Sequence, residues 1–133
     1  MIDSNVSTVI QAWSNAATVL LETRRRDGSW VGTPVSVVVA DGHAYFRTYD
    51  ASGKAKRLRR RPDVRVAPCS FLRGRPKGPA VAATARLLDG VEAERARTAL
   101  DRRFPVLHGK LVPSVHRRKG WTTLHYELTL AAA

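Results

Sequence analysis

The chain has 133 residues, of which 44% are hydrophobic, so it is long enough and apolar enough to fold as one domain. Its 23 lysine and arginine residues exceed its 11 acidic residues and give a formal net charge of +12, which attracts anions. The single cysteine excludes an internal disulfide, and no apolar run is long enough for a membrane-spanning helix. We therefore expect one domain over residues 1–133, in a cytoplasmic protein without a membrane partner.

The first half of the chain contains one helical pattern followed by strand patterns. Apolar residues recur every three or four positions from Val6 to Trp13, which predicts a helix over 4–16. Only Asp41 and Gly42 separate two β-rich runs, and such a pair is typical of a two-residue hairpin because both positions need a positive φ. Strands are predicted over 18–24, 33–40 and 43–49.

The second half adds two helices and three more strands. Ser52 is a suitable N-cap and Pro62 ends the pattern that follows, which predicts a helix over 52–61. Further elements are predicted as strands over 63–69, 79–89 and 122–130, a basic turn at 73–78 and a helix over 91–104, while 105–121 shows no clear pattern. Mostly antiparallel strands with inserted helices predict an α+β, mainly β fold, as a small closed or half-closed barrel.

Several common catalytic and metal-binding patterns are missing from the sequence. The run Ser-Gly-Lys at 52–54 resembles the end of a phosphate loop, but Thr48 stands where the Walker pattern needs glycine. The four histidines and the lone Cys69 do not have the spacing of a metal site. His125 is interpreted as a surface or interface histidine on a strand. We therefore predict no metal site and no catalytic side chain.

Positive charge is concentrated between Lys54 and Arg61, where six of the eight residues are basic. The amino end of a helix attracts anions, and Lys54 in the first turn adds a full charge. Ser52 can offer a hydroxyl group, while Arg47 and Thr48 end the preceding strand and can close the same site. The sequence therefore predicts a phosphate site here. The rest of this basic block, from Lys56 to Arg61, fits a solvated helix face, although its first members can also continue the groove.

These motifs, in their order, resemble the pyridoxamine-phosphate-oxidase-like split β-barrel proteins over about residues 15 to 130. They are most similar to the branch that uses the deazaflavin coenzyme F420. The motifs are Thr-Pro-Val at 33–35, the Asp-Gly hairpin, Ser-Gly-Lys-x-x-x-Leu from 52, Arg-x-Pro-x-Val-x-Val-Ala-Pro-Cys ending at 69, and Arg-Gly-Arg-Pro at 73–76.

The resemblance implies a six-stranded antiparallel split barrel with short flanking helices, which forms a homodimer with cofactor sites at its interface. It implies that the cofactor phosphate lies against residues 48–54, with Ser52 and Lys54 at phosphate-contacting positions, and that the ring lies across residues 34–36. Together, the predicted cofactor-binding residues are Pro34, Val35, Ser36, Arg47, Thr48, Ser52, Lys54, Lys56 and Arg57.

Two departures argue against pyridoxamine phosphate oxidation and leave the small-molecule substrate open. Gly53 stands where those oxidases tend to carry arginine, and their carboxy-terminal Arg-x-His motif is absent. The resemblance instead implies an F420-dependent oxidoreductase that passes a hydride between the deazaflavin and an organic substrate. The cofactor supplies this chemistry, so the protein has only to bind and orient it.

Alternatives to this function remain. F420 carries a phosphodiester and a polyglutamate tail, which suits a groove formed by Arg47, Lys54, Lys56 and Arg57, whereas FMN has one compact phosphate. An FMN-dependent enzyme, or a split barrel that binds FMN, F420 or haem without a reaction, stays open. A nucleic-acid-binding module is disfavoured, because the aromatic residues precede the basic block instead of alternating with it. For Cys69 and Trp121, ordinary packing is favoured over lining the pocket.

Overall fold

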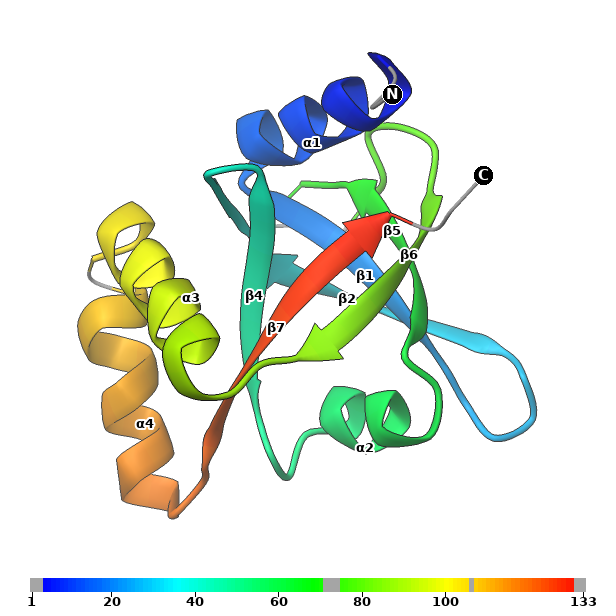
Figure 1. Cartoon of the computed structure of the whole chain (residues 1–133). Helices are drawn as coiled ribbons and strands as arrows, with labels where there is room; N and C mark the ends of the chain where they lie inside the picture. Colours follow the sequence, from blue (N-terminus) through cyan, green and yellow to red (C-terminus); the bar gives the residue numbers. More distant parts are fainter. Residues whose placement is uncertain (1–3, 71–74, 106, 131–133) are drawn as a thin grey trace.

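The computed structural model describes residues 4–70, 75–105 and 107–130, which form a curved antiparallel sheet with helices around it (Figure 1). The helices are α1 (Ser4–Ala16), α2 (Gly53–Arg60), α3 (Gly90–Arg103) and α4 (Val112–Lys119), with a π-helical turn η1 (Leu107–Leu111) before α4. The strands are β1 (Thr18–Arg24), β2 (Trp30–Ser36), β3 (Val38–Ala40), β4 (His43–Tyr49), β5 (Asp63–Pro68), β6 (Val81–Leu87) and β7 (Thr123–Leu130). Within the described ranges, no helix is long and apolar enough to cross a membrane.

The strand order shows how the sheet closes on itself. The order is β2-β1-β5-β6-β7-β4-β3, and each neighbouring pair is antiparallel. The two edge strands, β2 and β3, are consecutive in the chain and are joined by Val37 alone. The sheet therefore has to curl until its two edges meet at this residue. Val37 is buried and donates a backbone hydrogen bond of 2.9 Å to the carbonyl of Ala17.

The prediction of six strands is corrected to seven in the described part of the chain, because the strand predicted over 33–40 is divided. Its first part pairs with β1, where Thr18 lies opposite Ser36. Its second part pairs with β4, where Val38 lies opposite Tyr45. The partner changes at the intervening residue, so one continuous β-rich sequence forms two strands. The other predicted strands and the helices over 4–16 and 91–104 are confirmed within one to two residues at most ends.

The Asp-Gly hairpin is confirmed between β3 and β4. Asp41 and Gly42 have φ values of 52° and 78°, as a two-residue turn of this kind requires. The segment 105–121, for which the sequence shows no pattern, forms η1 and α4 over most of its length. Part of the predicted basic turn at 73–78 lies outside the described residues.

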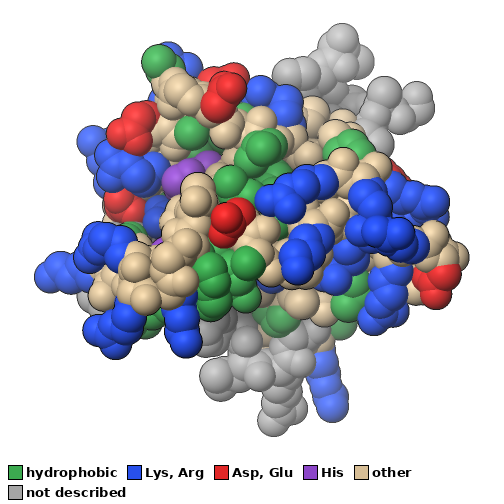
Figure 2. Space-filling model, turned by 90° about the horizontal axis from the view of Figure 1, so that it is seen from below, with side chains coloured by type: hydrophobic (Ala, Val, Ile, Leu, Met, Phe, Trp, Pro, Cys, Tyr) green, Lys and Arg blue, Asp and Glu red, His purple; other side chains and the backbone are tan. Residues whose placement is uncertain are grey.

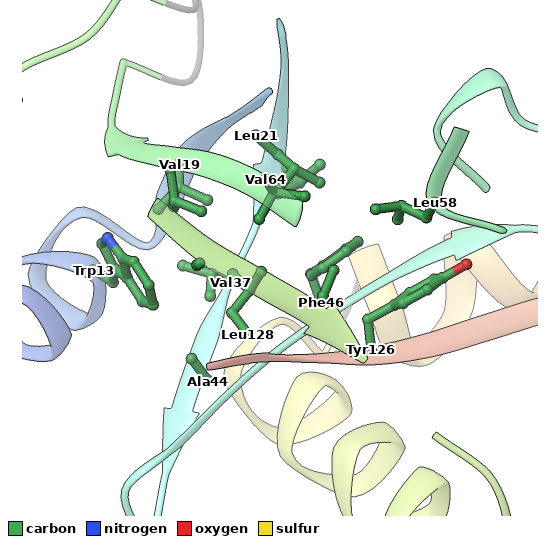
Figure 3. Close-up of a cluster of buried hydrophobic side chains, with 14 residues drawn as sticks. Trp13, Val19, Leu21, Val37, Ala44, Phe46, Leu58, Val64, Tyr126 and Leu128 are labelled. Carbon is green, nitrogen blue, oxygen red and sulfur yellow. The ribbon is translucent and has the colours of Figure 1, made fainter. Parts of the chain in front are cut away.

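The hydrophobic core fills the barrel and is closed by helices at both ends. Phe46 and Tyr126 stack inside it with their ring centroids 5.0 Å apart. Trp13 from α1 and Leu58 from α2 enter the same core from opposite sides (Figure 3). The core residues of the strands follow the alternation of the pleat, so every second side chain points inward. The other side chains point outward and are available to form a site.

On β4 this alternation separates the core from the outer face. Ala44 and Phe46 belong to the barrel core, whereas Tyr45 packs outside it in a second cluster with Leu88 and residues of α3. Arg47 has the same parity as Tyr45 and therefore also lies on the outer face. Helix α3 contacts β3, β4 and β7 on this side. It is the covered outer face of β4, at its carboxyl end, that carries the candidate site.

Candidate functional site

A hollow of about 210 Å³ brings together six of the nine predicted cofactor-binding residues. They come from the end of β2, the end of β4 and the first turn of α2, and α4 supplies the remaining wall. The lining residues are Pro34, Val35, Ser36, Arg47, Thr48, Tyr49, Lys54, Val112 and His116. We call this hollow the anion pocket. It contains no carboxylate among its lining residues, although it contains two cationic side chains.

A larger hollow of about 680 Å³ lies between β3, β4 and α3 and contains none of the predicted residues. Arginines of α3 line it, but so do Asp41 and Glu94, which reduce its positive potential. The larger hollow has the greater volume. The anion pocket, however, is lined by cationic side chains without a lining carboxylate, and residues from four different elements meet there. We regard the anion pocket as the candidate site, because an anionic ligand needs charge that the protein itself leaves unneutralised.

Ser52 fixes the start of α2 below the anion pocket. Its hydroxyl oxygen accepts a hydrogen bond of 3.0 Å from the backbone N–H of Ala55, which confirms the predicted N-cap. The hydroxyl of Thr48 donates a second bond of 3.0 Å to the same oxygen. Ser52 is buried and does not line the pocket. Its geometry therefore holds the end of β4 and the start of α2 together.

Lys54 is the cation of the anion pocket that lacks an acidic partner. It is half-buried, and within the described part of the chain no carboxylate forms an ion pair with it. Burial, together with the charge of Arg57, lowers the pKa of Lys54 from its ordinary value. A partly desolvated ammonium group without a counter-charge is unfavourable, and an anion bound beside it relieves that cost.

Arg47 is more deeply enclosed and shares its charge with α3. Its side chain is 3% exposed, and its guanidinium donates a hydrogen bond of 2.8 Å to Asp101. Asp101 also accepts a bond of 3.2 Å from Arg97 on the same helix. Burial lowers the pKa of Arg47, and Asp101 opposes that shift. Arg47 thus lines the pocket but contributes less uncompensated charge than Lys54.

Arg57 and Lys56 occupy different places, although the sequence predicts both as parts of one groove. The guanidinium of Arg57 donates a bond of 2.6 Å from Nε to the hydroxyl of Thr23 and lies against the amino end of α2. A Cβ atom on Gly53 would lie 2.8 Å from one of its terminal nitrogens, so glycine leaves the room that Arg57 occupies. Lys56 is exposed and does not line the pocket.

The last part of the basic block is confirmed as a solvated helix end. Arg59, Arg60 and Arg61 are exposed. Helix α2 lies at the lower end of the barrel in Figure 1, and the view from below shows many lysine and arginine side chains spread over this face (Figure 2). This face raises the concentration of anions near α2 without forming a site of its own.

His116 is the lining residue that the sequence does not predict. It lies on α4, is buried, and its Nδ1 is hydrogen-bonded to the hydroxyl of Thr123 on β7. Burial and the charge of Arg47 lower its pKa, while Asp50 raises it. One signal could have located the helix: Pro113 stands in the first turn of α4, where proline is favoured.

Two aromatic side chains pack beside His116, and one of them, Tyr49, also lines the pocket. Tyr49 stacks on Trp121 with ring centroids 3.9 Å apart and an interplanar angle of 12°. The ring of His116 meets Tyr49 edge-on at 5.6 Å. Trp121 therefore has a packing role, as favoured from the sequence. Cys69 is likewise buried away from the pocket, and burial raises the pKa of its thiol.

His125 is interpreted from the sequence as a surface or interface histidine, and the surface part of this interpretation is wrong. It is 9% exposed, lies opposite Arg47 in the β4–β7 pair, and its buried Nε2 has no hydrogen-bond partner among the described residues. Burial, with a contribution from Arg47, lowers its pKa to about 4. A strand pattern places His125 on the outer face, but only the packing of α3 on that face buries it. His125 is therefore neutral at neutral pH and does not line the anion pocket.

Comparison with known proteins gives a fold but no family. No protein-family model and no curated protein matches the chain. Solved structures do match. HutZ, named as the heme storage protein of Vibrio cholerae, aligns with a TM-score of 0.69 and 12% identity over 96% of this chain and 90% of its own. The fold is a split β-barrel.

Two further structures support this split barrel. A candidate pyridoxamine 5'-phosphate oxidase from Listeria innocua aligns with a TM-score of 0.65 and 11% identity, over 97% of this chain and 95% of its own. A heme binding protein from Mycobacterium smegmatis aligns with a TM-score of 0.64 and 15% identity, over 98% of this chain and 52% of its own. At these identities the likeness establishes the split-barrel architecture alone.

Proposed function

We propose that this split barrel is an F420-dependent oxidoreductase that holds the phosphate of its deazaflavin in the anion pocket. The observation that carries the proposal is Lys54, a half-buried cation without a carboxylate partner among the described residues, at the first turn of a helix and inside a hollow. The helix dipole and the ammonium group attract the same anion. The exposed arginines at the carboxyl end of α2 suit a ligand that is anionic along its length.

The residues of the pocket would bind and orient the cofactor. The deazaflavin supplies hydride transfer when it is bound. Lys54 holds the phosphate, and Ser52 keeps the first turn of α2 in position through its two hydrogen bonds. Exposed Pro34 and half-buried Ser36 offer the edge of β2 to the ring. The substrate is a small organic molecule, and nucleic acid is not the ligand.

We also propose the homodimer that the resemblance implies, in which a second copy completes the cofactor site. The monomer has a mass of 14.7 kDa. Sedimentation equilibrium measures the assembly directly, and we expect twice that mass. A single species at the monomer mass would contradict the dimer.

Binding of another cofactor is the second candidate function. Two of the matched structures are named as haem proteins and one as a candidate pyridoxamine 5'-phosphate oxidase, so haem and FMN are the competing ligands. The test is a titration of the purified protein with F420, FMN and haem, followed by absorbance or fluorescence. We expect micromolar or tighter binding of F420 and weaker binding of the other two. Tight binding of FMN or haem without binding of F420 would overturn the proposed reaction.

A further inference from the structure

We propose that His116 is a second cationic ligand of the anion pocket, which takes up a proton when a phosphate or sulfate-type oxyanion binds. The inference rests on the anion pocket of the proposed function and concerns its ligand chemistry. It assigns a role to α4, which lines the pocket together with β2, β4 and α2.

The geometry leaves one polar edge of the imidazole for a ligand. Nδ1 of His116 is held by the hydroxyl of Thr123, so this contact fixes the orientation of the ring. Nε2 has no hydrogen bond within the described part of the chain, and His116 lines the anion pocket together with Lys54. A histidine that offers Nε2–H to an oxyanion donates a hydrogen bond when neutral and a stronger, charge-assisted one when protonated.

The charged groups around His116 determine whether its ring is protonated before an anion binds. Arg47 on β4 disfavours protonation of the ring, and Asp50 after β4 favours it. Lys54 on α2 lines the same pocket, so it adds positive charge there. The rest of α4 is also basic near His116, with Arg117, Arg118 and Lys119 following it. Thr123 on β7 is neutral.

Binding of an anion reverses this balance. Without a bound anion, burial and the charge of Arg47 favour neutral imidazole. An oxyanion between Lys54 and His116 stabilises the imidazolium, so the bound state holds more protons than the free state near neutral pH. By linkage, the affinity for the anion must then rise as pH falls through the range in which His116 titrates. A pocket with permanent charges alone would show no such rise.

Inorganic sulfate is the probe, because it stays a dianion over about pH 5 to 8, the range in which histidine titrates. Calorimetric titration in two buffers with different ionisation enthalpies gives the number of protons taken up. For the wild-type protein we expect fractional proton uptake, and an affinity that rises several-fold between about pH 8 and pH 6. His116→Asn should lose the uptake. His43→Asn is the matched control, because this exposed histidine lies outside the pocket.

A second measurement needs no variant. The ring signal of His116 in NMR spectra of the wild-type protein reports its pKa with and without saturating sulfate, and we expect sulfate to raise it. If sulfate binds, depends on Lys54 and leaves the His116 titration unchanged, the inference is overturned while the anion pocket stands. If sulfate does not bind at millimolar concentration, the anion pocket of the proposed function fails together with the inference.

Discussion

The two lysines of α2 show that the position of a residue, and not its type alone, decides whether it can contact a bound anion. Lys54 and Lys56 are two residues apart, which on an α-helix places them on different faces. Lys54 is half-buried in the anion pocket, whereas Lys56 is exposed. The sequence places Lys54 in the first turn of α2, because that place follows from Ser52 and Gly53, and the structure confirms this position. The sequence also predicts Lys56 as a cofactor-binding residue, but this side chain does not line the anion pocket.

The burial of His125 makes the free energy of unfolding depend on pH. Its folded-state pKa of about 4 lies below the ordinary value of 6.5, so in this interval the unfolded chain binds a proton that the folded chain does not. Its contribution is fully present above about pH 6.5 and is lost as pH falls toward 4. We expect the free energy of unfolding to fall by about 2 kcal/mol between about pH 7 and pH 5 through this residue.

Urea unfolding at the two pH values measures this loss. His125→Leu should shrink the difference by that amount, because it removes the buried titrating ring. Equal pH dependence in the wild-type and His125→Leu proteins would mean that the buried ring is not the group responsible.

Among the helices, strands and turns, the features that depend on neighbouring residues in the chain are those that the sequence predicts. The Asp-Gly turn and the N-cap at Ser52 are set by neighbours in the chain, and both are confirmed. The division of the strand over 33–40 depends on which strands lie beside it, so the sequence pattern alone shows one element. For the same reason the sequence does not predict His116 as a lining residue, because α4 reaches the site only through tertiary packing.

Gly53 and Arg57 form a unit at the start of α2 that can be tested. In Gly53→Ala, the added Cβ would meet a terminal nitrogen of Arg57 at 2.8 Å and push this flexible side chain away. We expect a change in stability below about 1 kcal/mol, because alanine is also the better helix former. Cofactor affinity should fall several-fold, because the charge of Arg57 is displaced from the amino end of α2.

A double-mutant cycle with Arg57→Ala supplies the control. If Gly53→Ala acts by displacing Arg57, it should have little further effect once Arg57 is truncated. Fully additive losses of affinity would show that the glycine matters for another reason, such as direct approach of the ligand to the backbone.

At the scale of the whole molecule, the barrel separates packing from binding. Inward side chains and the two end helices form the core, so the outer face of β4 is free to carry polar groups. The order of turns and strands predicts a small closed or half-closed barrel, and the family resemblance narrows this expectation to a split barrel. The burial of His125 and the pairing of Arg47 with Asp101 depend on α3 lying against that face, which no local pattern specifies.

The most direct test of the phosphate site is the dissociation constant of F420 for Lys54→Ala beside that for Lys56→Ala. Both changes remove one positive charge from α2, so they alter the general field equally. A charge-assisted hydrogen bond contributes about 1.5–3 kcal/mol, so we expect Lys54→Ala to weaken binding at least about tenfold. Lys56→Ala should stay within about twofold, since exposed charges contribute little. Equal losses in the two variants, or none in Lys54→Ala, would contradict the account.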